Sequence, residues 1–308
     1  MSGASVLYDV PGPRAVLRNR ILGVITVVLV LLAVGFVVYR FWQTGQFDAA
    51  RWNIFTYTLV WQGLLDALWA TVSAFLTAAV GSLILGFALA IGRLSDHAVV
   101  RVPIMIITEL LRAVPVLVMM MIFYFGINSI PNFPFKMTPY LAVVIGLVLY
   151  NGSVLAEVLR AGVEALPKGQ REAGYAIGLR KSGVMTFILL PQAVRAMLPV
   201  IIAQLVVTLK DTALGFIITY PELLYYAKYL SSQPGRPLLQ AGLVVAVFYI
   251  SMCLILSFVA YRVEKSISRS PKVQGLGQPH DPAADDEATL TEAIALQKGA
   301  GKHDSSSF

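Results

Sequence analysis

The segment that decides the fold is AEVLRAGVEALPKGQREAGYAIGLRKSGVMTFILLPQAVRAMLP, residues 156–199, a polar stretch that joins two apolar ones. Pro167 and Gly169 mark the end of one helix. Residues 170–179 then have the pattern of a short amphipathic helix, and Gly178 is placed to end it. The pattern alone leaves two interpretations open. The helix either docks on a partner protein or lies on the lipid surface as a connector.

The chain around this segment is unusually apolar. Of its 308 residues, 57% are hydrophobic and only 13% are charged, whereas soluble domains carry about 25% charged residues. Apolar runs of about twenty residues are typical of membrane-spanning helices. Six such runs occur, at about 21–41, 64–91, 102–125, 139–158, 189–218 and 238–261. The sequence therefore predicts an all-α, polytopic membrane protein with six transmembrane helices, the first retained rather than cleaved as a signal peptide.

The Lys and Arg residues predict the orientation in the membrane. Fourteen of them fall on one side of the six runs: Arg14, Arg18, Arg20, Arg93, Arg101, Arg160, Lys168, Arg171, Arg180, Lys181, Arg262, Lys265, Arg269 and Lys272. The opposite loops hold Arg40, Arg51, Lys136, Lys228 and Arg236. Both termini and the polar segment are therefore expected in the cytoplasm. The net charge of +7 reflects this topology, and no nucleic-acid partner is expected.

Two ionisable residues lie in the third run. Glu109 and Arg112 are three residues apart and share a helix face. They could form a buried intrahelical pair, or Arg112 could line a polar cavity close to the bilayer midplane and meet an anionic group. Pro115 frees a backbone carbonyl, which predicts an opening of the helix.

A second charged group, Lys210 and Asp211 followed by Thr212, lies in the fifth run. Adjacent helix residues point about 100° apart, so at least one of the two charges must face another helix or a cavity. Gln204 in the same run is a weaker candidate for lining a cavity, and an interhelical hydrogen bond explains it equally well. Asp66, with Trp69, is expected as an anchor at the membrane interface.

Chemical motifs are scarce. The three histidines, His97, His280 and His303, have no partners at metal-ligand spacing, and no GxxxxGK, HExxH or GxSxG motif occurs. The chain is therefore expected to hold no catalytic residue, no metal and no cofactor, and not to bind ATP itself.

The polar segment resembles the EAA loop of ABC importer permeases, matching at Glu172, Ala173, Gly178 and Leu179. It is most similar to the polar amino acid uptake branch (histidine, glutamine and glutamate type). Matching positions are Ala156, Glu157, Arg160, Gly162, Gly169, Gln170, Pro191, Gln192, Ala193, Arg195, Pro199, residues 210–212, Leu214 and residues 221–224. The similarity covers about residues 64–262. The extra first run and the acidic tail look most like a permease subunit of actinobacterial glutamate uptake systems.

The resemblance implies a type I ABC importer permease core of five helices with one extra N-terminal helix, in the bacterial cell membrane. It also implies partners: a dimer of ATP-binding subunits, a second permease subunit (a related chain or a second copy), and an extracytoplasmic substrate-binding protein. The residues that would contact the ATPase are Gly169, Gln170, Glu172, Ala173, Gly178 and Leu179. The expected regions are a cytoplasmic segment 1–20, the extra helix and outer loop 21–60, the core 61–265 with its coupling loop 157–185, and a disordered cytoplasmic tail 266–308.

The resemblance also implies a substrate cavity, with Glu109, Arg112, Lys210, Asp211 and Thr212 as the substrate-binding residues. Arg112 and Lys210 would meet carboxylates and Asp211 an ammonium group, which favours glutamate, with glutamine next. The chain departs from the branch near this cavity, because residues 111–115 read Leu-Arg-Ala-Val-Pro in place of Phe-Arg-Gly-Thr-Pro, and Ala213 replaces a serine. The alternative is a secondary transporter or channel driven by an ion gradient.

Overall fold

The computed structural model describes residues 12–235 and 237–267. Within these ranges the chain is helical and forms no strand, which confirms the all-α prediction. The α-helices are α1 (Pro13–Gln43), α2 (Thr58–Arg93), α3 (Ala98–Ala113), α4 (Val116–Met121), α5 (Pro139–Glu164), α6 (Lys168–Ala176), α7 (Lys181–Gly183), α8 (Leu190–Asp211), α9 (Leu223–Ser231) and α10 (Leu238–Ile267). Short 3-10 helices cover Ala49–Thr56 and Thr212–Ile218, and π-helical turns cover Ile122–Gly126 and Val184–Leu189. The predicted disordered tail falls almost entirely on residues 268–308, outside the described ranges.

Six membrane crossings are compatible with these helices. Five stretches are long and apolar enough to cross a bilayer: Arg14–Gln43, Thr58–Arg93, Pro139–Glu164, Lys181–Ile218 and Leu238–Lys265. The sixth is a bent pair, because α3 and the segment that contains α4 meet at an angle of 96°. The break lies where the sequence predicts an opening. Pro115 cannot donate a backbone hydrogen bond, and Val114 before it is extended, with φ −85° and ψ 125°.

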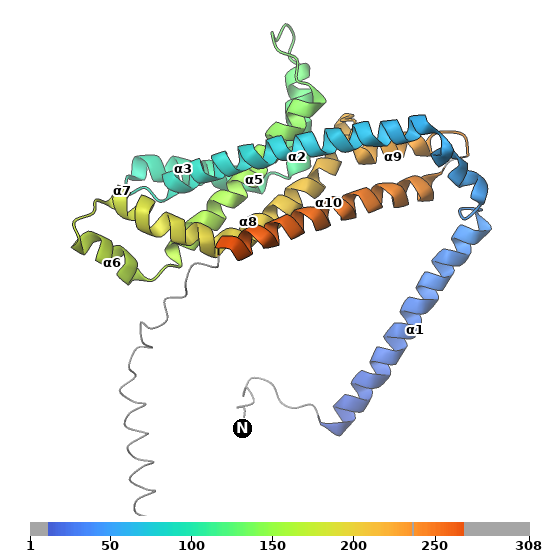
Figure 1. The fold of residues 1–308 in the computed structure, drawn as a ribbon, viewed down its shortest axis with the longest axis horizontal. Coiled ribbons are helices and arrows are strands. Elements are labelled where there is room, and N and C mark those ends of the chain that lie inside the picture. The colour runs from blue at the N-terminus through green and yellow to red at the C-terminus, as the bar shows by residue number, and fades with distance from the viewer. Residues whose placement is uncertain (1–11, 236, 268–308) are drawn as a thin grey trace, which may run out of the picture. The chain divides into compact units, whose positions relative to one another are not determined.

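Small residues set the central packing of α2 on α5, which run side by side (Figure 1). A Cβ atom on Gly86 would lie 2.8 Å from Leu155 Cβ and 3.1 Å from the carbonyl oxygen of Gly152. Only glycine permits this approach. Helix α2 therefore packs inside the bundle. Among the described residues, this pair of helices forms the centre of the bundle.

A polar contact joins α8 to α5 inside the bundle. Gln204 Nε2 donates a hydrogen bond of 2.7 Å to Asn151 Oδ1, and Asn151 Nδ2 donates one of 2.9 Å to the Leu147 carbonyl. Of the two interpretations of Gln204, the structure shows the interhelical hydrogen bond. Asn151 is fully buried, so its amide needs these partners.

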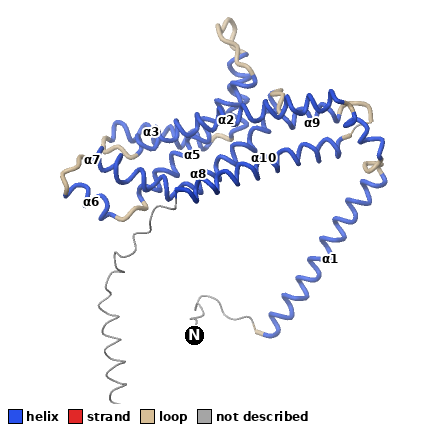
Figure 2. Tube along the Cα trace, in the orientation of Figure 1, coloured by secondary structure: helices blue, strands red, loops and turns tan. Residues whose placement is uncertain are grey.

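The extra helix α1, a single long helix in Figure 2, has no buried residue among its described side chains, in contrast to the other long helices α2, α5, α8 and α10. The loop after α1 is nevertheless attached to the start of α10. Gln240 is fully buried there, and its Nε2 donates a hydrogen bond to the Gln46 carbonyl. Arg51, in the 3-10 helix that follows, donates a bond of 3.2 Å to the Gly235 carbonyl.

Helix α9 was not anticipated from the sequence. It packs on the first half of α2 through buried Leu64, Ala67, Leu223, Ala227 and Leu230. Helix α6 lies at one end of the bundle and α9 at the other (Figure 1).

Candidate functional site

Helix α6 (168–176) is the short polar helix that the sequence predicts at 170–179. It begins two residues earlier and ends three residues earlier than predicted. It begins after Pro167 and ends in a turn where Gly178 has φ +81°. The Gly178 amide donates to the Tyr175 carbonyl at 2.9 Å, and the Leu179 amide donates to the Gly174 carbonyl at 3.1 Å. This pair of bonds is a Schellman motif, whose left-handed position favours glycine. The expected role of Gly178 as the end of the helix is confirmed.

One side of α6 is packed against the chain and the rest faces outward. Gly174 is buried, and a Cβ atom there would lie 2.8 Å from Val184 Cγ2 and 2.9 Å from Ile188 Cδ1. Leu179 is half-buried against the same cluster. The other five expected coupling residues are exposed: Gly169, Gln170, Glu172, Ala173 and Gly178. Ile177 joins them with 75% exposure, an apolar residue that the sequence analysis did not select.

The Glu109–Arg112 pair exists, and it is part of a larger network. Arg112 Nη1 lies 3.4 Å from Glu109 Oε1, but both side chains are at least one-third exposed in the single chain. Glu109 is also 3.3 Å from Arg93 Nη1, at the end of α2. Arg93 in turn lies 2.8 Å from Glu157 on α5. The network therefore joins α2, α3 and α5, a connection that the spacing of Glu109 and Arg112 alone does not reveal.

The network continues along α5 toward α6. Arg160 Nη2 lies 2.5 Å from Glu157 and its Nη1 lies 2.5 Å from Glu164. A separate ion pair joins Asp96, in the loop between α2 and α3, to Lys181 at the start of α7. The hydrogen bond from Lys181 holds the pKa of Asp96 below its ordinary value. Both connections lie at the α6 end of the bundle.

Lys210, Asp211 and Thr212 lie where α8 passes into a 3-10 helix. Lys210 is exposed and lines a groove of about 520 Å³ beside Tyr249 and Cys253 of α10. Asp211 is half-buried, and Thr212 is buried and donates a 2.6 Å bond to the Leu209 carbonyl. The two charges therefore have different surroundings, as their spacing predicts.

The five expected substrate residues do not converge on one site inside a single chain. In the described ranges, no hydrogen bond or ion pair joins Glu109 or Arg112 to residues 210–212. Their assignment as substrate-binding residues stays a prediction. Across the same ranges, no three His, Cys, Asp or Glu side chains are grouped so that they could hold a metal ion.

Glu222 is a buried charged group that the sequence analysis named only as part of a motif. Its carboxylate accepts bonds of 2.7 Å from the amides of Leu224 and Tyr225 and a bond of 2.8 Å from the Tyr249 hydroxyl. Burial raises the pKa of Glu222 to about 7, although these donors favour the charged form. Glu222 caps α9 and ties it to α10. A glutamate directly before a Leu-Leu pair was the only available signal for this cap.

Comparison with known proteins places these features in context. Residues 82–269 match the family described as the binding-protein-dependent transport system inner membrane component. A glutamate transport system permease protein, GluD of Corynebacterium glutamicum, is 39% identical over 224 residues, covering 72% of this chain and 82% of that protein. The glutamine transport system permease protein GlnP of Escherichia coli is 32% identical over 222 residues, 71% of this chain and 97% of GlnP.

Two solved structures share the fold. The crystal structure of an amino acid ABC transporter with histidines covers 70% of this chain and 97% of its own, with a TM-score of 0.62 and 24% identity. An inward-facing MetNI methionine ABC transporter covers 69% of this chain and all of its own, with a TM-score of 0.59 and 15% identity.

Proposed function

Because the chain belongs to the family of binding-protein-dependent transport system inner membrane components, we propose that it carries glutamate through an ATP-driven importer. The coarser function is established: it is a permease subunit of an ABC amino acid importer, and as a permease with several transmembrane helices it lies in the bacterial inner membrane. This membership selects the importer over the ion-gradient alternative. The observation that supports glutamate as the substrate is the 39% identity to a glutamate permease.

The family is the membrane component of importers that work with an ATPase and a binding protein. We infer that ATP is hydrolysed by a separate pair of ATP-binding subunits and that this chain supplies the path. A second permease subunit, either a related chain or another copy, completes that path.

We further propose that both termini and α6 face the cytoplasm. The Lys and Arg bias supports this orientation. The exposed residues of α6 would then fit a surface cleft of the ATPase. Gly174 supports this role, since its packing on Val184 and Ile188 joins α6 to the start of the next span. A displacement of α6 by the ATPase would therefore move that span.

A polar path between the two permease subunits accounts for the separation of the charged residues in one chain. Arg112 and Lys210 are exposed in the single chain, so a second subunit could complete a cavity with them. In that cavity Arg112 and Lys210 would meet the carboxylates of glutamate. Asp211 would meet its ammonium group, with Glu109 and Thr212 beside them.

The test is reconstitution of the chain with its ATP-binding subunits, second permease subunit and binding protein in liposomes. Glutamate should stimulate ATP hydrolysis and accumulate inside the liposomes. Stimulation by glutamine but not by glutamate would assign a different substrate. Uptake by this chain alone, without ATP, would contradict the role of a permease subunit.

A further inference from the structure

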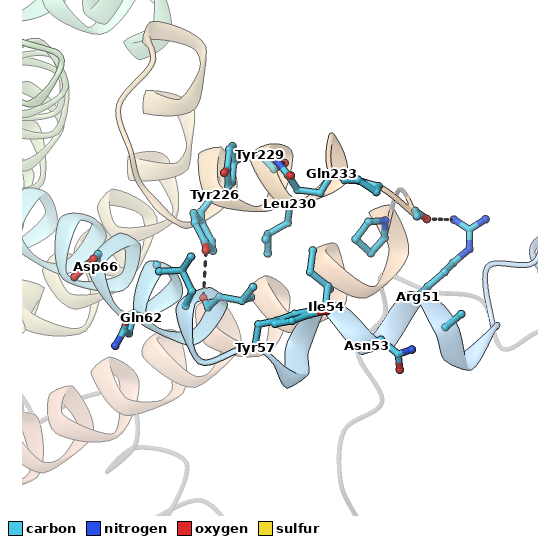
Figure 3. A pocket seen from close by; sticks show the side chains of 17 residues that line it. Arg51, Asn53, Ile54, Tyr57, Gln62, Asp66, Tyr226, Tyr229, Leu230 and Gln233 are labelled. Carbon is cyan, nitrogen blue, oxygen red and sulfur yellow. Dashed lines mark hydrogen bonds between the residues drawn. The ribbon is translucent and has the colours of Figure 1, made fainter.

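A cavity of about 780 Å³ lies at the α9 end of the bundle (Figure 3). Its walls are the 3-10 helix Ala49–Thr56, the first turns of α2, and α9 with the turn that follows. The volume is in the range of small-molecule sites. These walls begin before residue 82, so the 3-10 helix and the first turns of α2 lie outside the region that matches the family.

The acidic and the basic side chain that line the cavity differ in whether they have hydrogen-bond partners. Asp66 is the only acidic residue among the described residues of the lining, and its exposed carboxylate has no hydrogen bond or ion pair with any of the described residues. Arg51 is the only described basic residue of the lining, and it donates 3.2 Å bonds to the carbonyls of Gly235 and Thr44. Lys228 of α9 lies over the ring of Phe216, 5.8 Å from its centroid, and does not line the cavity. Among the described lining residues, the Asp66 carboxylate is therefore the charge available to a ligand.

Two tyrosine rings line the same cavity as Asp66. The rings of Tyr226 and Tyr229 have centroids 5.7 Å apart. The Tyr226 hydroxyl donates a 3.3 Å bond to the Val60 carbonyl, as Figure 3 shows. Gly63 makes room for this ring, since a Cβ atom there would lie 2.2 Å from the Tyr226 hydroxyl. Burial raises the pKa of Tyr226, and the nearby Tyr229 and Asp66 raise it further.

A carboxylate and two tyrosine rings that line one cavity are groups that recognise an organic cation. We propose that this cavity binds a ligand through its ammonium group, which Asp66 neutralises while Tyr226 and Tyr229 supply the aromatic surface. A cationic ligand is favoured because the Asp66 carboxylate has no described partner, whereas Arg51, which keeps its charge, already donates to the carbonyl groups of Gly235 and Thr44.

Two sources could supply such an ammonium group. One is the amino group of an amino acid on its way to the translocation path. The other is the headgroup of an ethanolamine phospholipid, because exposed Trp61 and Trp69 are residues typical of the membrane interface. The proposal rests on the proposed function only for the outward orientation of the cavity.

The test measures binding of radiolabelled ethanolamine to the purified importer in detergent. Asp66→Asn should weaken binding about tenfold or more, since the ion pair is lost. Tyr229→Leu should weaken it about fivefold. Asp48→Asn is the matched control, because Asp48 is exposed and near but does not line the cavity. Equal melting temperatures would show that the variants are folded.

Competition distinguishes the two sources. Displacement of ethanolamine by glutamate would identify an amino acid ligand. Loss of ethanolamine binding in nanodiscs of phosphatidylethanolamine, but not of phosphatidylglycerol, would identify a lipid headgroup. Equal ethanolamine binding by the wild type and Asp66→Asn would overturn the proposal. If glutamate still stimulated ATP hydrolysis in that case, the proposed transport function would stand.

Discussion

Arg93 Nη1, at the end of α2, lies 2.8 Å from Glu157 Oε2 on α5. The Arg93 side chain is only 9% exposed, and its second partner is Glu109 on α3. A buried cation is tolerated when carboxylates neutralise it and accept its hydrogen bonds. Arg93 therefore joins α2, α3 and α5 through ion pairs at the α6 end of the bundle.

Removal of the Arg93 cation should destabilise the bundle. Arg93→Met leaves Glu157 paired with Arg160, so we expect a loss of about 1–3 kcal/mol rather than the full cost of an isolated buried charge. Thermal unfolding of the purified subunit measures the change. Arg101→Met is the control, because Arg101 is exposed, and it should change stability by less than about 0.5 kcal/mol. Equal effects of the two substitutions would contradict this assignment of Arg93.

Arg112 should matter for transport more than for assembly. Arg112→Ala removes a half-exposed guanidinium whose described partner is Glu109, so the complex should still form. Glutamate uptake by liposomes should fall about 100-fold or more if Arg112 meets a substrate carboxylate. Arg18→Ala in α1 should leave uptake unchanged. Normal uptake by Arg112→Ala would contradict a role of Arg112 in substrate binding and would leave the Glu109–Arg112 pair with a structural role only.

The turn at the end of α6 should not tolerate a side chain. With φ +81° at Gly178, Gly178→Ala should cost about 1–2 kcal/mol of local stability. We expect weaker co-purification of the ATPase and less substrate-stimulated ATP hydrolysis. Gly183→Ala, at the end of α7, tests the same chemical change at a position with φ −65° and only ordinary van der Waals contacts around it. Equal coupling in the two variants would mean that the turn does not position α6.

Glu222 should make stability depend on pH. Its carboxyl pKa rises from 4.5 to about 7 on folding, so the folded state binds more protons than the unfolded state between these values. The contribution of Glu222 to stability should therefore be largest below about pH 4.5, fall as the pH rises to about 7, and change little above that. The full difference is roughly 3 kcal/mol. Melting temperatures between pH 5 and 8 measure it.

Glu222→Gln is the control for that pH dependence. The amide keeps an oxygen that can cap α9, but it cannot ionise. The melting temperature of this variant should vary less over the same pH range than that of the wild type. An unchanged pH profile would assign the dependence to another group.

The spans and the coupling helix could be predicted because their signals are local. Apolar runs mark the helices, Pro115 marks the break, and Gly178 marks the end of α6. A proline restricts the backbone of the residue before it, and a positive φ favours glycine. Both effects are steric and act within a few residues, so they do not depend on the rest of the fold. The EAA resemblance added the expected partners.

The long-range contacts could not be predicted in the same way. Nothing in the spacing of Arg93, Glu109 and Glu157 says that three helices bring them together. Helix α9 is short, and its cap depends on Tyr249, which is 27 residues away. Asp66 was expected as an interfacial anchor, but the cavity that it lines forms only when Ala49–Thr56 and α9 meet over α2.

The 96° bend between α3 and α4 has a consequence for water. A break inside an apolar span ends the regular helical bonding on both sides, and hydrocarbon cannot satisfy the backbone groups that are freed. Hydration or a neighbouring subunit must therefore solvate the chain around Val114 and Pro115. Lipid tails alone are an unsuitable environment for this part of the permease. The bend thus identifies the part of the third crossing that water should reach first when the translocation path opens.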